Sequence, residues 1–175
     1  SRGLGDVYKR QVKDVRALRE RVGAEYPGLP CFLLGHSMGS FVVRGYLMFW
    51  PGTVDGAILS GTGQEPPATV AAGRALSALL IRLKGPRAHS ALLDALSVGR
   101  YNGQFKPVRT SADWISRDTV VVDAYRADPL CRFLPTVGMY HDMMVGLQLL
   151  AKPANLARMD PDTPVYFFAG DRDPV

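Results

Sequence analysis

The sequence predicts an α/β fold, in which helices flank a parallel sheet and a helical segment is inserted between two strands. Short apolar runs at 31–35, 54–60 and 164–169 have the length and composition of buried parallel strands. Helical patterns precede and follow the first run, and this order of helix, strand, helix and strand indicates parallel pairing. Roughly seventy residues without a clear core strand separate the second run from the third, and an insertion of that length is typical of a functional cap.

The elements before the insertion follow from apolar spacing and from the positions of proline. Apolar residues recur at three- and four-residue steps over 12–22, which predicts an amphipathic helix that ends before Pro27. The run 31–35 is apolar throughout, so we expect a buried strand of the parallel type. Residues 38–50 show a second helical pattern, which ends before Pro51.

The insertion and the return to the sheet define the expected organisation. Two helical patterns with proline starts occupy 66–100, a turn-rich stretch follows, and further helical patterns begin at 119 and 137. We therefore divide the chain into a leader at 1–11, an α/β core at 12–63, a helical cap at 64–137 and a return to the core at 138–175.

Composition and charge exclude several classes of protein. Apolar residues make up 47% of the 175 residues, which is enough for a buried core and too many for a disordered chain. The net charge of +5 is scattered rather than gathered in a basic run, which argues against nucleic-acid binding. Cys31 and Cys131 belong to no zinc or redox motif. No apolar run reaches the ~18 residues of a membrane span and no secretory signal opens the chain, so we expect a cytoplasmic protein.

A serine between two glycines, in Gly35-His36-Ser37-Met38-Gly39, stands between the first strand and the helix that follows it. This context is characteristic of a nucleophile elbow, a tight turn that projects the serine hydroxyl from the strand end. We expect the two glycines to avoid a collision where strand and helix cross. The backbone N–H of Met38, at the helix N-terminus, would face an acyl oxyanion. A plain glycine-rich turn is the alternative.

The sequence offers an acid for this serine but no convincing base. Asp171 and Asp173 follow the last strand, at the edge where catalytic groups gather in open α/β sheets. A turn or a helix cap is the alternative role for these carboxylates. His36 adjoins the serine, but neighbouring side chains diverge at a sharp turn, so we expect it to support the elbow. We expect His89 to be a solvated helix residue.

The elbow segment LLGHSMGS, the turn GDRDPV and the inserted helices together resemble the α/β-hydrolase superfamily. More narrowly, the chain resembles the monoacylglycerol lipase and lysophospholipase group, also described as serine-aminopeptidase-like hydrolases. The cap phrases WISRD and ADPLCRFLPTVGMY are similar to those of bacterial members. The resemblance covers residues 12–175 and implies a partial α/β-hydrolase fold with an inserted helical cap.

The resemblance also implies roles for particular residues. Ser37 matches the nucleophile, Met38 the residue whose N–H forms half of the oxyanion hole, and Asp173 the triad acid, three residues after Gly170. In this family the histidine follows the acid, so we expect the triad histidine not to lie in this chain. His141 precedes the acid, and we do not expect it to hydrogen-bond Ser37. The family's first oxyanion turn is also missing upstream, so we expect an internal fragment.

The expected activity of the whole protein is hydrolysis of carboxylic esters through an acyl-enzyme on Ser37. We expect a monoacylglycerol lipase or a lysophospholipase-like esterase, with a small acyl ester or lipid as substrate and with no metal or organic cofactor. The leucine, alanine and methionine of the cap suit an acyl chain, and packing within the cap explains them equally well. An aminopeptidase, a thioesterase, a carbon–carbon hydrolase and a non-catalytic binding protein are the alternatives.

The first eleven residues, SRGLGDVYKRQ, are unusual for a protein start. They lack an initiator methionine and resemble a translated adapter sequence. We therefore set residues 1–11 apart as a non-native leader, with an ordinary loop and first helical turn as the alternative.

Overall fold

The computed structural model describes residues 6–131 and 133–173. Its elements, in chain order, are α1 (Asp6–Glu25), β1 (Phe32–His36), α2 (Met38–Phe49), β2 (Gly56–Ser60), α3 (Pro67–Lys84), α4 (Ala91–Leu96), the 3₁₀ helix η1 (Val98–Gln104), α5 (Thr119–Ala127), the 3₁₀ helix η2 (Pro129–Cys131), α6 (Val137–Leu150), α7 (Pro153–Leu156) and β3 (Val165–Phe168).

The strands form one parallel sheet in the order β1-β2-β3, which confirms the predicted fold class. Phe32 of β1 pairs with Gly56 of β2, and Ala57 of β2 pairs with Val165 of β3. Because all pairs are parallel, the carboxyl ends of the strands meet at one edge of the sheet. The central strand β2 carries the most deeply buried sheet residues, among them Leu59.

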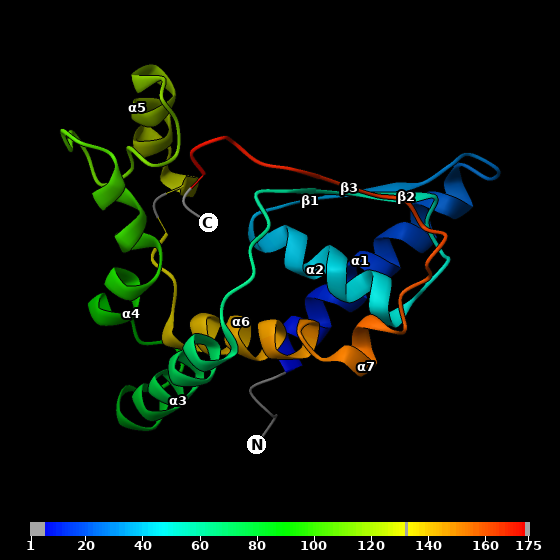
Figure 1. Ribbon diagram of the computed structural model, residues 1–175, viewed down its shortest axis with the longest axis horizontal. Helices are drawn as coiled ribbons and strands as arrows, with labels where there is room; N and C mark the ends of the chain where they lie inside the picture. The colour runs from blue at the N-terminus through cyan, green and yellow to red at the C-terminus, as the bar shows by residue number, and fades with distance from the viewer. Residues whose placement is uncertain (1–5, 132, 174–175) are drawn as a thin grey trace.

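Helices cover one face of the sheet, where α1, α2 and α6 pack against one another (Figure 1). The opposite face is open, and on it Phe32 and Leu34 of β1 are 59% and 64% exposed. The expectation that β1 is buried was therefore wrong for this structure. The run is apolar on both faces, but only the face toward α2 is covered, and β1 lies at an edge of the sheet.

Helix α1 begins at Asp6, earlier than its apolar pattern predicted. Tyr8 is buried in the main core, and its hydroxyl donates a 2.6 Å hydrogen bond to the carbonyl of Phe41 on α2. Its ring also lies against Gly146 of α6, where an added Cβ would come within 2.8 Å of it. Tyr8, inside the segment set apart as a leader, thus makes core contacts with two other helices.

The inserted helices stand beyond the carboxyl ends of the strands (Figure 1). Helix α3 packs along α6, and a second apolar cluster joins Leu93 of α4 to Val137 and Tyr140 of α6. His89 was expected on a helix, but it lies between α3 and α4 and pairs with Thr136 in an isolated antiparallel bridge. The helix was expected because the sequence around His89 resembles that of the flanking helices. The bridge could not be predicted, because Thr136 lies far along the chain.

Candidate active site

Ser37 occupies the sharp turn between β1 and α2 with a strained backbone, at φ 50° and ψ −122°. Its N–H donates to the carbonyl of Ser60 at the end of β2, at 2.9 Å. Its carbonyl accepts from the N–H and the hydroxyl of Ser40, at 2.9 and 2.5 Å. Left-handed conformations of non-glycine residues persist only where neighbours over-determine them, and they concentrate at functional sites. The side chain of Ser37 is exposed.

Only one of the two elbow glycines is explained by crowding. A Cβ on Gly35 would lie 2.5 Å from the carbonyl oxygen of Gly39 and 2.8 Å from the Cα of Ser40. This confirms that Gly35 lets the strand approach the helix. A Cβ on Gly39 would meet no atom within 4 Å outside the backbone of its own helix. The expectation that Gly39 also avoids a collision was therefore wrong, because its added Cβ would point into open space.

Met38 is the first residue of α2, directly after the serine. The first N–H groups of a helix have no intrahelical acceptor, and they carry the positive end of the helix dipole. The Met38 N–H is therefore available, by its position, to a negative oxygen beside Ser37. The side chain of Met38 lines the cavity into which Ser37 opens.

Asp173 follows β3, and Ser37 follows β1, so both lie at the same edge of the sheet with β2 between them. This confirms the predicted placement at one edge. Gly61 has no side chain, but a Cβ added to it would lie 3.1 Å from Asp173 Oδ2. The same Cβ would lie 3.5 Å from the His36 ring, so the Asp173 carboxylate and the His36 ring both approach Gly61. The triad role of Asp173 stays a prediction.

Asp171 faces a different partner from Asp173. Its carboxylate accepts a hydrogen bond from Arg117 in the cap, at 2.5 Å, and the two side chains form an exposed ion pair. This hydrogen bond and the charge of Arg117 hold the pKa of Asp171 below its usual range. The acid turn is thus joined to the cap through Asp171.

The histidines of the described segments do not supply a base to Ser37. His36 is exposed, and its Nδ1 lies 3.1 Å from the hydroxyl of Ser60. His141 is buried, and its Nδ1 lies 3.1 Å from Ser77 Oγ on α3. Burial lowers the pKa of His141, so the ring is favoured in its neutral form. The prediction that His141 does not hydrogen-bond Ser37 is confirmed.

Sequence reasoning missed a polar contact beneath the elbow. Ser40 is fully buried, and its hydroxyl lies 2.7 Å from the hydroxyl of Thr62 on the segment that leaves β2. Arg44, one helical turn further along α2, bonds the same segment. The sequence does contain a signal for these residues. Ser37, Ser40 and Arg44 are spaced by three and four residues, so they form a polar face on an otherwise apolar helix.

Ser37 opens into a cavity of about 1030 Å³ between the core and the cap. Phe41 and Met139 line it near the elbow, and Trp114 and Phe133 line it from the cap. Its wall also carries charged groups, including the Glu65–Arg100 ion pair at 2.5 Å. A cavity of this size, mainly apolar and with a few polar groups, suits a molecule with a long hydrocarbon part.

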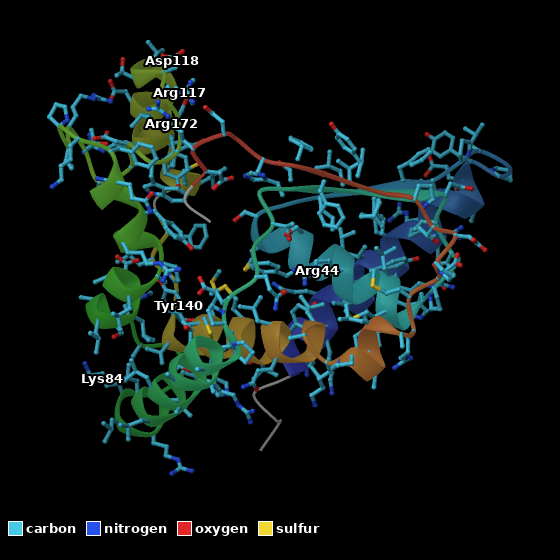
Figure 2. The ribbon with its side chains drawn as sticks, in the orientation of Figure 1. Arg44, Lys84, Arg117, Asp118, Tyr140 and Arg172 are labelled. Carbon is cyan, nitrogen blue, oxygen red and sulfur yellow. The ribbon has the colours of Figure 1, made fainter. Side chains whose placement is uncertain are left out.

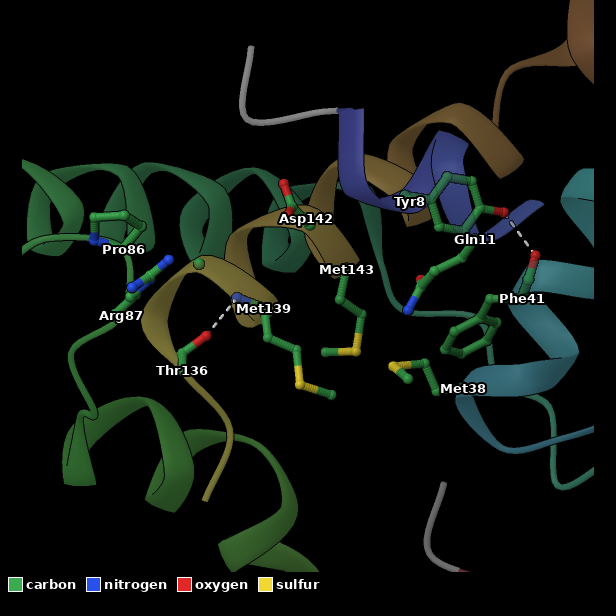
Figure 3. A pocket seen from close by; sticks show the side chains of 11 residues that line it. Tyr8, Gln11, Met38, Phe41, Pro86, Arg87, Thr136, Met139, Asp142 and Met143 are labelled. Carbon is green, nitrogen blue, oxygen red and sulfur yellow. Dashed lines mark hydrogen bonds between the residues drawn. The ribbon is translucent and has the colours of Figure 1, made fainter. Parts of the chain in front are cut away.

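A smaller cavity of about 320 Å³ adjoins the first between α1, α2 and α6. In Figure 3 the side chains of Met38, Met139 and Met143 point toward one another at its centre. These three residues line both cavities, so flexible thioether side chains form the wall between them.

Two further findings concern possible partners of the described segments. Among residues 6–131 and 133–173, no group of three or more histidine, cysteine or acidic side chains is placed to hold a metal ion. Over the same residues, no helix has both the length and the apolar character needed to cross a membrane.

The parallel sheet, the strained serine at a helix N-terminus and the acid turn at the same edge define an α/β-hydrolase. The serine aminopeptidase S33 family matches residues 1–175, and the chain belongs to that family.

The proteins to which this chain is similar include lipases and an esterase. The chain is 37% identical over 119 residues to a monoacylglycerol lipase of Mycolicibacterium smegmatis, covering 68% of this chain and 36% of that protein. It is 32% identical over 158 residues to the human monoglyceride lipase, covering 89% of this chain and 45% of that protein. A thermostable carboxyl esterase from Bacillus coagulans, solved in complex with glycerol, matches with a TM-score of 0.85 at 26% identity, over 100% of this chain and 56% of that one. The chain thus spans less than half the length of these two lipases.

Proposed function

We propose that the whole protein is a serine hydrolase that cleaves carboxylic esters, such as monoacylglycerols. The observation that carries the proposal is the strained, exposed Ser37 at the mouth of a large and mainly apolar cavity. The named lipase relatives support the same class of substrate.

In the proposed reaction, Ser37 Oγ attacks the ester carbonyl while a histidine removes its proton. The alcohol leaves with that proton, and water then attacks the acyl-enzyme and releases the acid. Neither His36 nor His141 hydrogen-bonds Ser37, since the Nδ1 atoms of the two rings face Ser60 and Ser77. We propose that the histidine comes from a segment beyond these 175 residues, as the resemblance implies.

Asp173 is the proposed orienting acid, because it follows β3 at the edge that carries Ser37. The N–H of Met38 is the proposed first donor to the oxyanion. Donors of this kind stabilise the transition state by on the order of 3 kcal/mol each. The donor is held in place by α2, whose start is fixed by the hydrogen bonds of Ser37 and Ser40.

The cavity also contains features that favour a second substrate class. The carboxylates of Glu65 and Asp94 line its wall, and a carboxylate is the group that would bind the amino terminus of a peptide. However, Glu65 is paired with Arg100, and Asp94 accepts a hydrogen bond from Tyr140. Both carboxylates therefore already have partners within the protein. For this reason an aminopeptidase is the second candidate, after the esterase.

The test uses the whole protein with a panel of substrates. We expect hydrolysis of monoacylglycerols and p-nitrophenyl esters, no release from amino-acid p-nitroanilides, and labelling of Ser37 by a fluorophosphonate probe. The Ser37→Ala variant should lose both turnover and labelling, with its circular dichroism spectrum unchanged.

Three results would contradict the proposal in different ways. Turnover of p-nitroanilides without ester hydrolysis would favour the aminopeptidase. Labelling at another serine would remove Ser37 from its role. Folded protein that neither labels nor turns over any substrate would favour a non-catalytic binding protein.

A further inference from the structure

The segment that leaves β2 runs along helix α2 before it enters the cap, and α2 holds it at two successive points. Ser40 Oγ bonds the hydroxyl of Thr62 at 2.7 Å. Arg44 then donates from Nη1 to the carbonyl of Gly63 and from Nη2 to Oε1 of Gln64, each at 3.0 Å. One guanidinium therefore fixes both the backbone and a side chain of this segment.

The guanidinium of Arg44 is itself held in one orientation. Arg44, which is labelled in Figure 2, is half-buried. Its guanidinium lies over the Phe41 ring, with 5.9 Å between Cζ and the ring centroid. The carbonyl of Phe41 accepts the hydroxyl of Tyr8, which ties the same turn of α2 to α1. A planar cation that is stacked on a ring loses little further freedom when it donates two hydrogen bonds.

The two residues that Arg44 holds belong to the wall of the main cavity. Gly63 and Gln64 line it together with Ser37 and Phe41, whereas Arg44 is not among its lining residues. Arg44 therefore acts on the cavity through the residues that it bonds. Gln64 is the first residue of the cap and Gly63 directly precedes it, so their position sets where the cap begins relative to the serine.

We propose that Arg44 is a positioning residue that fixes the start of the cap against the nucleophile helix and so favours substrates whose acyl chains reach the cap. This inference rests on the proposed esterase function. A short acyl group fills only the region beside Ser37. A long chain also contacts Trp114 and Phe133 on the cap, so its binding depends on where the cap stands.

The test compares acyl-chain selectivity in whole-protein variants. The measured quantity is the selectivity ratio, which is kcat/KM for p-nitrophenyl decanoate divided by kcat/KM for p-nitrophenyl acetate. We expect Arg44→Ala to lower this ratio about tenfold, because two charge-assisted hydrogen bonds are lost. The change should arise mainly from a higher KM for the decanoate. Arg44→Lys keeps the charge but not the planar fork, so it should restore only part of the ratio. Gln64→Ala should change the ratio in the same direction, and less than additively with Arg44→Ala.

Arg16→Ala is the matched control. Arg16 also lies over an aromatic ring, that of Trp50, and bonds a side chain, that of Glu20. Unlike Gly63 and Gln64, Glu20 is not among the residues that line the cavity. We expect its selectivity to equal that of the wild type. Titration with the fluorophosphonate probe corrects every rate for the fraction of folded, reactive enzyme.

The outcomes separate this inference from the function on which it rests. An unlabelled and inactive wild type would overturn the esterase itself. An active wild type, with Arg44→Ala and Gln64→Ala at the wild-type ratio, would overturn only the role of Arg44. An equal loss for both esters would assign Arg44 a purely structural role and would also overturn the proposal.

Discussion

The strain at Ser37 is maintained by groups other than its own hydroxyl. Its N–H is bonded to Ser60, and its carbonyl is bonded to both the N–H and the hydroxyl of Ser40. The hydroxyl of Ser37 makes none of these bonds. The turn should therefore persist when the hydroxyl is removed, which makes Ser37→Ala a clean test of chemistry rather than of folding.

Asp171 and Asp173 allow a matched test of the triad acid. We expect Asp173→Asn to lower kcat of the whole protein by about 10³- to 10⁴-fold, because an amide no longer orients the histidine and stabilises its charged form. Asp171→Asn should leave kcat near the wild-type value, since Asp171 pairs with Arg117 in the cap. Ester hydrolysis at saturating substrate measures both variants, and the opposite ranking would exchange the two assignments.

The two elbow glycines permit a similar comparison of stability. Gly35→Ala should lower the free energy of unfolding by about 3 kcal/mol, because the new methyl meets backbone that cannot move aside. Gly39→Ala lies in open space within a helix and should have no effect or raise stability by up to about 1 kcal/mol. Urea titration followed by circular dichroism gives both values. Equal losses for the two variants would contradict the crowding seen only at Gly35.

At the residue scale, the sequence predicted what depends on neighbours in the chain. Ser37 and Met38 follow from one strand-turn-helix string, and their positions agree with the structure. Ser40 and Arg44 could not be found in this way, since their partners lie 19 to 22 residues away on another segment. A short string shows where a backbone turns, but not which distant polar groups hold it.

Between elements, Tyr8 is one of the side chains that join α1 to the rest of the core, together with Val12. Its hydroxyl bonds α2, and its ring fills a notch at Gly45 and Gly146, where any side chain would displace it. Tyr8→Ala should lower the free energy of unfolding by about 3–5 kcal/mol, and Tyr8→Phe by about 1 kcal/mol. Urea unfolding measures both changes.

Tyr26, which directly follows α1, provides the control, because it is 53% exposed. Tyr26→Ala should change the free energy of unfolding by no more than about 0.5 kcal/mol. In the Tyr8→Ala background, Gly146→Ala should also cost less than it does alone, since the ring that it displaces is gone. Wild-type stability in Tyr8→Ala would contradict the packing of this ring in the core.

The order of elements was predicted well because prolines and glycines divide this chain clearly. Pro27 and Pro51 follow the first two helices, and the three predicted strands are present at β1, β2 and β3. The short helix at Pro153–Leu156 was missed, since one turn leaves no periodic pattern. The bridge of His89 to Thr136 was missed because it forms between distant segments.

At the scale of the molecule, residues 6–131 and 133–173 place helices on one side of the sheet only. Phe32, Leu34, Tyr166 and Phe168 share the open face by their register, and each is between 47% and 65% exposed. Parallel sheets are normally covered on both faces, because their strands are apolar on both. The sequence shows the apolar character of these strands, but only the packing of the helices shows which face remains open.

This open face predicts how the 175-residue chain behaves when it is expressed alone. We expect self-association, because an apolar sheet face beside an exposed edge strand is a template for pairing with other copies. Combining Leu34→Ser with Tyr166→Ser should shift the chain toward the monomer in size-exclusion chromatography with light scattering. Leu130→Ser with Val120→Ser removes apolar groups of the cap that are even more exposed, at 83% and 73%, and this pair should not shift the chain toward the monomer. A monomeric unsubstituted chain, or equal effects of the two pairs, would show that the sheet face does not drive association.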